Sequence, residues 1–466
     1  MRRHPLAIMV LLVLSATASL AQAQEALAPE ITAGIDAAVM KALKETGVPG
    51  ASVAVVHDGA IALAKAYGRA RLDPPAPATP AMRYPIGSIS KQFTAAAVAM
   101  LAAEGKLGLE DRVAKFLPDL PRAGDITLRQ ILSHTAGIRD YWPQDFVPAT
   151  MLEPITPDAL LGRWARQPLD FEPGSKYQYS NTGYVLAGAI VEKVSGRPLM
   201  EFQRERIFRP LGMDSVVDFD QGGLTGGDPA GYVRYALGPL RPAPKEGKGW
   251  MFAAGHLAMT AADLARWDAA FIDGTVPGPA VSRALTQEVV LASGAGSGYG
   301  LGVGIELKGD RRIISHGGEV SGFTAENRVY PEDRAAIVVL ANQDAVDAAS
   351  AIADRIAELL FVSASPADAQ MLGRVTGILE GLRKGRIDRA LFTQNANAYF
   401  SDVALKDIGA SLKRLGALKE IKPVRQGLRG GFVTRVYRAV LAKQTLRIVT
   451  RAQPDGAIEQ YMLSVE

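Results

Sequence analysis

Ser88 and Lys91 lie three residues apart in YPIGSISKQFTAAAVAML, residues 84–101. Pro and Gly open this stretch and an alanine-rich run closes it, which predicts a loop leading into a helix. Residues three apart on a helix share a face, so the Lys91 amine can reach the Ser88 hydroxyl. A serine hydroxyl is a weak nucleophile that needs an adjacent base. The pair therefore indicates nucleophilic catalysis, and the structural alternative is a Ser88 helix cap beside a solvated lysine.

Two later stretches add residue types that could assist such a nucleophile. YQYSNTGY contains Tyr179 and Asn181, and ISHGGEVSGF contains His316-Gly317-Gly318. Alone, each has an ordinary structural explanation, as a core tyrosine, a turn asparagine or the end of a strand. Desolvation and neighbouring positive charge would lower the pKa of Lys91 so that its amine can accept a proton.

In this order, the three stretches resemble the motifs of the serine hydrolase family of class C β-lactamases, penicillin-binding D-alanyl-D-alanine peptidases and related esterases. That family carries Ser-x-x-Lys, then Tyr-x-Asn, then Lys-Thr-Gly, His-Thr-Gly or His-Gly-Gly. The resemblance covers residues 30–360 and includes LSHTAGI (132–138) and AAGHLAMTAADLARW (253–267). It implies a serine hydrolase that forms an acyl-enzyme and requires no metal or organic cofactor.

The resemblance also implies a role for each motif residue. Ser88 is the nucleophile, Lys91 a proton acceptor, and Tyr179 the residue that passes a proton to the leaving group. Either Lys91 or Tyr179 could be the acylation base, since a cationic Lys91 would lower the pKa of Tyr179. The backbone N–H groups of Ser88 and Glu319 would form the oxyanion hole, and the two glycines would let substrate approach an edge strand. The implied substrate-binding set is Asn181, His316, Gly317, Gly318 and Glu319.

One departure from the family pattern bears on the substrate. His316 stands where β-lactamases have a lysine, so a fixed cation for the β-lactam carboxylate is missing, and Glu319 and Glu326 add negative charge nearby. The expected substrate is therefore an ester, an amide or a D-amino-acid peptide bond, in a small molecule or a peptide. The alternatives are a class C-type β-lactamase and a catalytically silent penicillin- or peptide-binding protein of the same fold. Candidates for lining the cleft are Tyr141, Trp142 and Trp250.

The N-terminal residues predict export to the periplasm or the exterior. Arg2 and Arg3 precede the apolar run LAIMVLLVL, and Ala21-Gln22-Ala23 follows it, which is the order of a secretory signal peptide over residues 1–23. The alternative, a transmembrane anchor, needs a longer apolar run. No later segment has one, so no membrane span is expected after signal cleavage. The absence of cysteine excludes disulfides, thiol catalysis and thiolate zinc sites.

The elements predicted around the motifs indicate the fold class. Strands are expected at both ends of residues 24–362, with a mostly helical block from 84 to 275 between them and a hairpin at Asp58-Gly59. Strands and helices do not alternate, so the sheet should be antiparallel. The predicted class is α+β: an antiparallel sheet flanked by helices, with a large helical subdomain as in β-lactamases and transpeptidases, and a small C-terminal α+β domain.

A change of composition marks this second unit. Residues 366–466 contain 17 Lys and Arg against 9 Asp and Glu, whereas residues 24–365 carry a net charge of −6. The boundary falls near SASPADAQ (363–370), whose Pro, Ser and Ala are typical of a linker. Two helical stretches and three strands should follow. The positive charge is either a solvated surface or a docking surface for anionic envelope polymers or lipid headgroups. Nucleic acid is not an expected partner of an exported chain.

Overall fold

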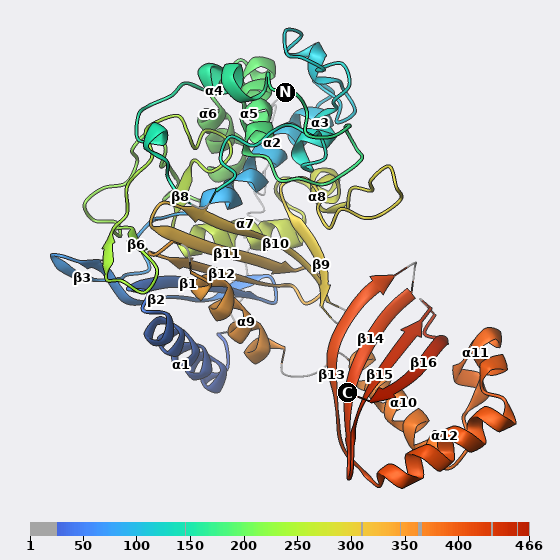
Figure 1. The fold of residues 1–466 in the computed structure, drawn as a ribbon. Coiled ribbons are helices and arrows are strands. Elements are labelled where there is room, and N and C mark those ends of the chain that lie inside the picture. Colours follow the sequence, from blue (N-terminus) through green and yellow to red (C-terminus); the bar gives the residue numbers. More distant parts are fainter. Residues whose placement is uncertain are drawn as a thin grey trace, which may run out of the picture.

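The structure is a computed structural model that describes residues 26–465, except 145, 309–310, 345, 362–365, 430–431 and 454. The predicted signal peptide lies outside the described residues, as do residues 363–365 of the predicted linker. The chain forms a first body around a seven-stranded sheet and a second body around a four-stranded sheet (Figure 1).

The central sheet is antiparallel and its strands come from both ends of the first body. Their order is β3-β2-β1-β12-β11-β10-β9. The strands are β1 (Gly50–His57), β2 (Ala60–Leu72), β3 (Pro75–Pro77), β9 (Gly304–Lys308), β10 (Arg311–Val320), β11 (Phe323–Tyr330) and β12 (Ala335–Ala341). β1 and β2 form the predicted hairpin, and β1 also pairs with β12. The predicted antiparallel sheet is therefore confirmed.

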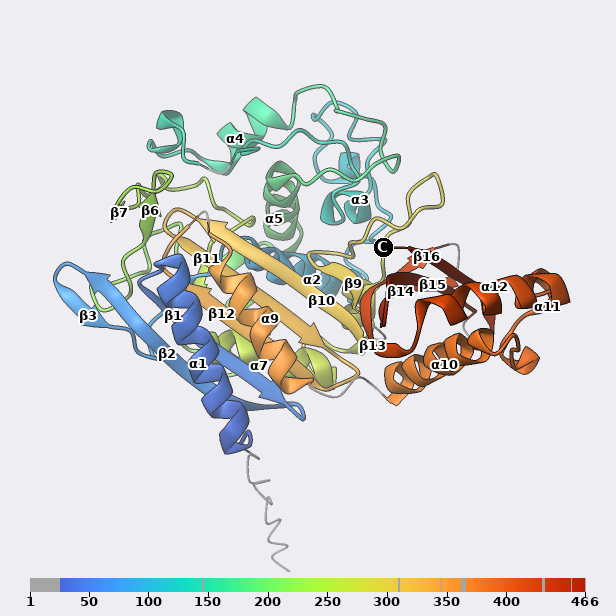
Figure 2. The ribbon, with the colours of Figure 1, turned by 60° about the horizontal axis from the view of Figure 1, so that its bottom comes forward.

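Helices cover both faces of this sheet. Successive side chains of a strand point to opposite faces, so both sets of side chains are buried. On β1, Val53 and Val55 pack in one hydrophobic cluster, whereas Ala54 and Val56 pack in another. This is why β1 is apolar throughout instead of alternating. The covering helices are α1 (Pro29–Thr46) and α9 (Ala348–Leu360) on one face, and α7 (Ala261–Asp273) with α2 (Ser90–Ala103) on the other (Figure 2).

The helical subdomain surrounds α2, whose side chains are buried from Ser90 to Leu101. Its other helices are α3 (Leu128–Leu132), α4 (Pro157–Trp164), α5 (Asn181–Ser195), α6 (Leu199–Gln203) and α8 (Pro279–Thr286). Its short strands are β4 (Tyr84–Pro85), β5 (Val217–Asp218), β6 (Tyr232–Arg234), β7 (Leu240–Pro242) and β8 (Leu257–Met259). Thr260 is the N-cap of α7, since its hydroxyl accepts the Asp263 N–H at 3.1 Å.

The C-terminal body has its own hydrophobic core and the predicted α+β class. Its elements are α10 (Pro366–Arg383), α11 (Gln394–Tyr399), α12 (Asp402–Leu415), β13 (Leu418–Arg429), β14 (Phe432–Leu441), β15 (Thr445–Ala452) and β16 (Ile458–Val465). The second half of the predicted linker is helical, because Pro366 suits a first helical turn. β13 lies beside β9 of the first body (Figures 1 and 2).

The prediction of three strands in this body was wrong, since β13 is a fourth. Pro423 and Gly427 argue against a strand in sequence. β13 is at the edge of the sheet, where a proline can be accommodated, and its register with β14 shifts between Pro423 and Arg425. None of the helices within the described ranges has the length and apolarity to cross a membrane.

Candidate active site

Ser88 lies in a short 3₁₀ turn, Gly87–Ile89, directly before α2. The alternative that Ser88 caps a helix is wrong, because the N-cap of α2 is Ile89 and no side chain makes a capping hydrogen bond there. Ser88 lines a cavity of about 1030 Å³. Its hydroxyl is therefore available to a bound molecule.

The backbone of this turn is in direct contact with β10. A Cβ atom added to Gly318 would lie 2.0 Å from the Ile86 carbonyl oxygen, and one added to Gly87 would lie 2.7 Å from the Glu319 nitrogen. Gly87 also has a φ of +49°, which favours glycine. Gly318 thus makes room for the Ile86 carbonyl at the start of the Ser88 turn, and not for substrate as predicted. The contact brings the Glu319 backbone N–H next to the Ser88 turn.

The Lys91 amine is completely buried and has three oxygen neighbours. Its Nζ lies 3.0 Å from Ser88 Oγ, 2.8 Å from Asn181 Oδ1 and 2.7 Å from the Ala254 carbonyl oxygen. Burial lowers the pKa of Lys91 to about 7, against the opposing charge of Asp140. Asn181 Oδ1 and the Ala254 carbonyl only accept hydrogen bonds. In the neutral amine, both N–H groups therefore point to these acceptors and the lone pair faces Ser88.

Asp140 orients Asn181, a function that the sequence did not reveal. One Asp140 oxygen accepts the Asn181 backbone N–H at 3.0 Å, and the other accepts its side-chain N–H at 3.2 Å. This fixes the amide so that Oδ1 faces Lys91. Asp140 lies in a loop just after the LSHTAGI stretch. A single aspartate in a loop has no characteristic spacing, so its function could not be predicted from the sequence.

Tyr179 contacts the nucleophile from the other side. Its hydroxyl hydrogen-bonds Ser88, and its ring centroid lies 4.9 Å from Lys91 Nζ. Burial raises the pKa of Tyr179, with the Ser88 hydrogen bond opposing it. Tyr179 therefore keeps its proton here, and of the two candidate bases that the sequence left open, Lys91 is the one whose pKa lies near 7.

His134, from LSHTAGI, supports Tyr179 from behind. The two ring centroids are 4.1 Å apart, and His134 Nδ1 accepts the Ser180 N–H at 3.0 Å. Burial and the nearby Lys91 hold the pKa of His134 well below its usual value, so the ring is neutral. The sequence shows this histidine in the shared LSHTAGI stretch, but its residue type and position there indicate no role.

His316 is neutral and lies beside the site instead of in the cavity wall. Its Nε2 is 2.8 Å from the Tyr299 hydroxyl, and its ring centroid is 6.2 Å from that of Tyr179. Burial and the charge of Lys91 lower its pKa to about 4.

Glu326 forms an ion pair with Arg328 at 2.7 Å, so its negative charge is compensated. Gly317 has no close neighbour that would exclude a side chain.

The cavity wall contains one of the three aromatic residues predicted to line it. Trp142 lines the cavity, whereas Tyr141 and Trp250 are buried and pack against each other with ring centroids 5.9 Å apart. The lining includes the motif residues Ser88, Tyr179, Asn181 and Glu319. The polar and charged residues that line it in addition are Arg139, Asp140, Gln144, Asp170, Gln178, Arg234, Ser321 and Asp344.

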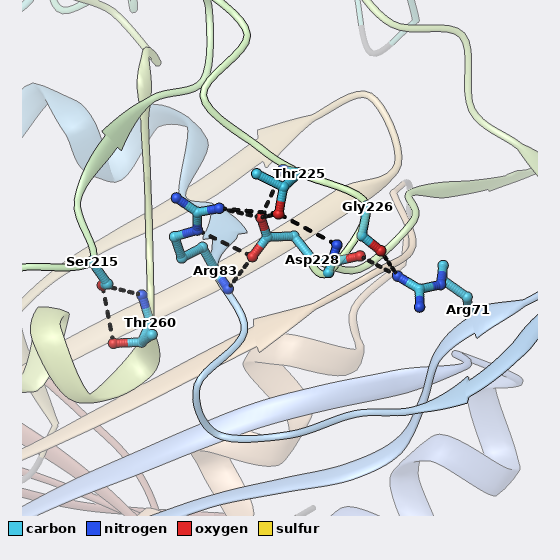
Figure 3. Close-up of polar contacts among 8 residues, drawn as sticks. Arg71, Arg83, Ser215, Thr225, Gly226, Asp228 and Thr260 are labelled. Carbon is cyan, nitrogen blue, oxygen red and sulfur yellow. Dashed lines mark hydrogen bonds and ion pairs between the residues drawn. The ribbon is translucent and has the colours of Figure 1, made fainter.

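An ion pair anchors the strand that leads into the Ser88 turn (Figure 3). Asp228 accepts hydrogen bonds from the Arg83 backbone N–H at 3.0 Å and from the Arg83 guanidinium at 2.5 and 3.1 Å. Thr225 adds its N–H at 2.9 Å. The Asp228 side chain is only 6% exposed. The pair thereby holds β4, which starts at Tyr84, against the loop that contains Asp228.

Known proteins share this fold at low sequence identity. The octameric penicillin-binding protein homologue from Pyrococcus abyssi superposes with a TM-score of 0.63 at 23% identity, over 93% of this chain and 99% of that chain. The D-stereospecific amidohydrolase from Streptomyces sp. gives a TM-score of 0.60 at 27% identity, over 70% of this chain and 98% of that one. These matches confirm the predicted fold class.

Sequence comparison identifies the family. A D-aminopeptidase from Brucella anthropi is 29% identical over 299 residues, which are 63% of this chain and 56% of that protein. The chain thus spans little more than half the length of this relative. The pattern of the family described as Beta-lactamase matches residues 35–361. The chain therefore belongs to the beta-lactamase family of serine hydrolases.

Proposed function

We propose that this enzyme hydrolyses amide or ester bonds of D-amino-acid derivatives through an acyl-enzyme on Ser88. The observation that carries the proposal is the buried Lys91 amine, 3.0 Å from Ser88 Oγ with a pKa of about 7. A purely structural lysine would have no need of such a position. The names of two relatives, a D-aminopeptidase and a D-stereospecific amidohydrolase, support the substrate class.

Acylation begins with neutral Lys91. The Ser88 oxygen attacks the substrate carbonyl carbon while its proton moves to Lys91 Nζ, which keeps its two N–H groups on Asn181 and Ala254. The raised pKa of Tyr179 favours Lys91 over Tyr179 as the base in this step. The carbonyl oxygen, now negative, is bound by the Ser88 and Glu319 backbone N–H groups.

Collapse of the tetrahedral intermediate needs a proton on the leaving group. Tyr179 donates its hydroxyl proton to the departing amine or alkoxide, and Lys91 returns the proton taken from Ser88 to Tyr179. A water molecule then attacks the ester carbonyl of the acyl-enzyme, its proton follows the same route in reverse, and Ser88 regains its hydroxyl hydrogen. The net reaction is hydrolysis of one bond.

The third motif disfavours anionic leaving groups. With a pKa of about 4, His316 carries no charge at neutral pH and offers no ammonium to a carboxylate. A class C-type β-lactamase activity is therefore expected to be weak. A silent binding protein would leave the buried Lys91 amine without a purpose.

Active-site labelling combined with a substrate panel tests the proposal. A fluorophosphonate probe should label the folded protein at Ser88. D-Alanine p-nitroanilide and a short-chain p-nitrophenyl ester should be hydrolysed faster than a chromogenic cephalosporin. A folded protein that neither reacts with the probe nor hydrolyses any member of the panel would contradict the proposal.

The hydroxyl of Tyr179 gives a separate prediction. Tyr179→Phe keeps the ring stacked on His134 but removes the proton donor, so kcat should fall about 10²-fold or more. The melting temperature should change little. Tyr177→Phe is the matched control, because Tyr177 also contacts the His134 ring, in an edge-to-face arrangement, but is not hydrogen-bonded to Ser88 in the described structure. Equal kcat values for both variants and the wild type would assign Tyr179 to packing alone.

The proposal includes action outside the cytoplasm. Residues 1–23 have the charge pattern and apolar run of a signal peptide. Mass spectrometry of the protein recovered from the periplasm or medium of an expressing bacterium should show a mature chain that begins at Gln24. Full-length protein retained in the cytoplasm would contradict this location.

A further inference from the structure

We propose that Asp344 and Glu246 form a subsite that binds an ammonium group on the acyl portion of the substrate. This inference rests on the proposed Ser88 acyl-enzyme and deepens it. It predicts that the enzyme acts on residues with a free amino group and discriminates against N-acylated ones. Three features support it: the direction of the substrate along β10, the contacts of the two carboxylates, and the charges around them.

The proton donor identifies the two ends of the cavity. The leaving group must lie near Tyr179, which is the side of β10 marked by His316. The oxyanion site lies at Glu319, farther along the strand. The acyl portion therefore extends beyond Glu319 towards Ser321, in the opposite direction from Tyr179. Ser321 is the first residue of the turn after β10 and follows Glu319 by two residues, so it lies within about 7 Å of the oxyanion site.

Each of the two carboxylates near this end has one oxygen without a hydrogen-bond partner among the described residues. Asp344 lines the cavity, and its Oδ2 accepts the Gly322 N–H at 2.9 Å. Glu246 lies behind the cavity lining and is only 6% exposed, and its Oε1 accepts the N–H and hydroxyl of Ser321, which does line the cavity, at 3.0 and 2.7 Å. Asp344 Oδ1 and Glu246 Oε2 are buried without a hydrogen-bond partner among the described residues. A buried acceptor without a donor is unfavourable, and a bound ammonium would supply one.

No cation of the described chain forms an ion pair with either carboxylate. Arg139, at the other end, is paired with Asp170. Arg234 also lines the cavity, but its guanidinium lies at Gly47, where an added Cβ would be 2.7 Å from Nη2. Lys245 weakly lowers the pKa of Glu246, but its amine lies over the Phe219 ring at 4.6 Å. Burial raises the pKa of both carboxyl groups, and a bound ammonium would reverse that effect.

The polarity of the cavity then selects one end of a peptide. The acyl end carries carboxylates, whereas at the leaving-group end His316, behind the cavity wall, is neutral and the charge of Arg139 is paired with Asp170. This arrangement fits removal of an amino-terminal residue, whose acyl part is cationic. It does not fit removal of a carboxy-terminal residue, whose leaving group is anionic.

Three chromogenic substrates that differ only at the amino group test the subsite in the wild-type enzyme. D-Alanine p-nitroanilide has a free ammonium, its N-acetyl derivative is neutral, and its N-succinyl derivative is anionic. We expect kcat/KM to fall in that order. The decrease in kcat/KM from the free-amine substrate to the N-acetyl substrate should be about ten- to a hundredfold, the range of a charge-assisted hydrogen bond. Equal or faster hydrolysis of the N-acetyl substrate would overturn the inference.

Asp344→Asn locates the effect. Asparagine keeps an oxygen for the Gly322 N–H and removes the charge, so the preference for the free amine over the N-acetyl group should fall about tenfold or more. Asp111→Asn is the matched control, because Asp111 likewise accepts a glycine N–H, from Gly108 at 2.7 Å, but lies outside the cavity lining. An unchanged preference in Asp344→Asn would also overturn the inference.

The outcomes separate this subsite from the proposed function. Fluorophosphonate labelling of Asp344→Asn shows that the variant is folded and its serine active, and the wild-type comparison needs no variant at all. If the enzyme hydrolyses all three substrates equally and still loses activity with Ser88→Ala, the acyl-enzyme stands and the ammonium subsite is wrong. If Ser88→Ala keeps full activity, the proposed function itself fails.

Discussion

Ser88→Ala is expected to abolish both hydrolysis and covalent labelling. Removal of the nucleophile should lower kcat about 10⁶-fold, as in other serine enzymes that act through a catalytic set. The melting temperature should stay close to that of the wild type, because Ser88 makes no capping hydrogen bond at the start of α2. Steady-state kinetics, fluorophosphonate labelling and a thermal melt measure the three effects.

Ser401→Ala is a control that should lower stability without changing activity. Ser401 is the N-cap of α12 in the C-terminal body, where its hydroxyl accepts the Ala404 N–H at 3.3 Å. Its loss should lower the free energy of unfolding by about 1 kcal/mol and leave kcat unchanged. If Ser88→Ala behaved like Ser401→Ala, with activity retained on every wild-type substrate, Ser88 would not be the nucleophile.

Lys91→Arg should have the second largest effect. Arginine stays protonated at every accessible pH and cannot accept the Ser88 proton. It would also place a permanent charge and a larger group in a fully buried position. We expect the rate of acylation to fall about 10³-fold or more. This is the usual range for the loss of a general base together with a displacement of the reacting groups. Stopped-flow release of p-nitrophenol from an activated ester measures this step.

The matched control is Lys193→Arg. Lys193 is partly buried on α5, donates to the Phe116 carbonyl oxygen at 2.7 Å and is not part of the cavity lining. An arginine there should change kcat/KM by less than about twofold, as is usual for substitutions outside a functional network. Near-normal acylation by Lys91→Arg would make Lys91 an ordinary structural lysine.

The wild-type pH profile tests the same group without a mutation. Since the pKa of Lys91 is about 7, the neutral amine predominates above pH 7 and the ammonium below it. kcat/KM reports groups of the free enzyme, so it should fall tenfold per pH unit below 7 and level off above. A flat profile from pH 5.5 to 8.5 on an ester that does not itself titrate would exclude Lys91 as the base.

Several structural features of this protein could be predicted from short stretches of its sequence. The three-residue spacing of Ser88 and Lys91 places both on one side of a helix start, and the structure joins their side chains at 3.0 Å. The Asp58-Gly59 turn predicted the β1–β2 hairpin. Such features depend on neighbours within a few residues, so the sequence itself contains the necessary information.

Local signals also misled at two points. Ser88 had the residue type of a helix cap, but the chain enters α2 through a 3₁₀ turn that needs none. Pro423 argued against a strand, yet β13 is an edge strand that tolerates it. In both cases the outcome depended on the position of the segment in the assembled body.

The protonation states and the shape of the cavity were decided only by tertiary structure. Lys91 takes its lowered pKa from complete burial, against the opposing charge of Asp140, and one of its hydrogen-bond acceptors, the Ala254 carbonyl, lies 163 residues away in the chain. Asp140 orients Asn181 across 41 residues of chain, and Glu246 reaches Ser321 across 75. No periodicity encodes these pairs. Desolvation and hydrogen bonding depend on which distant segments cover a group, and that is known only when the whole chain has been placed.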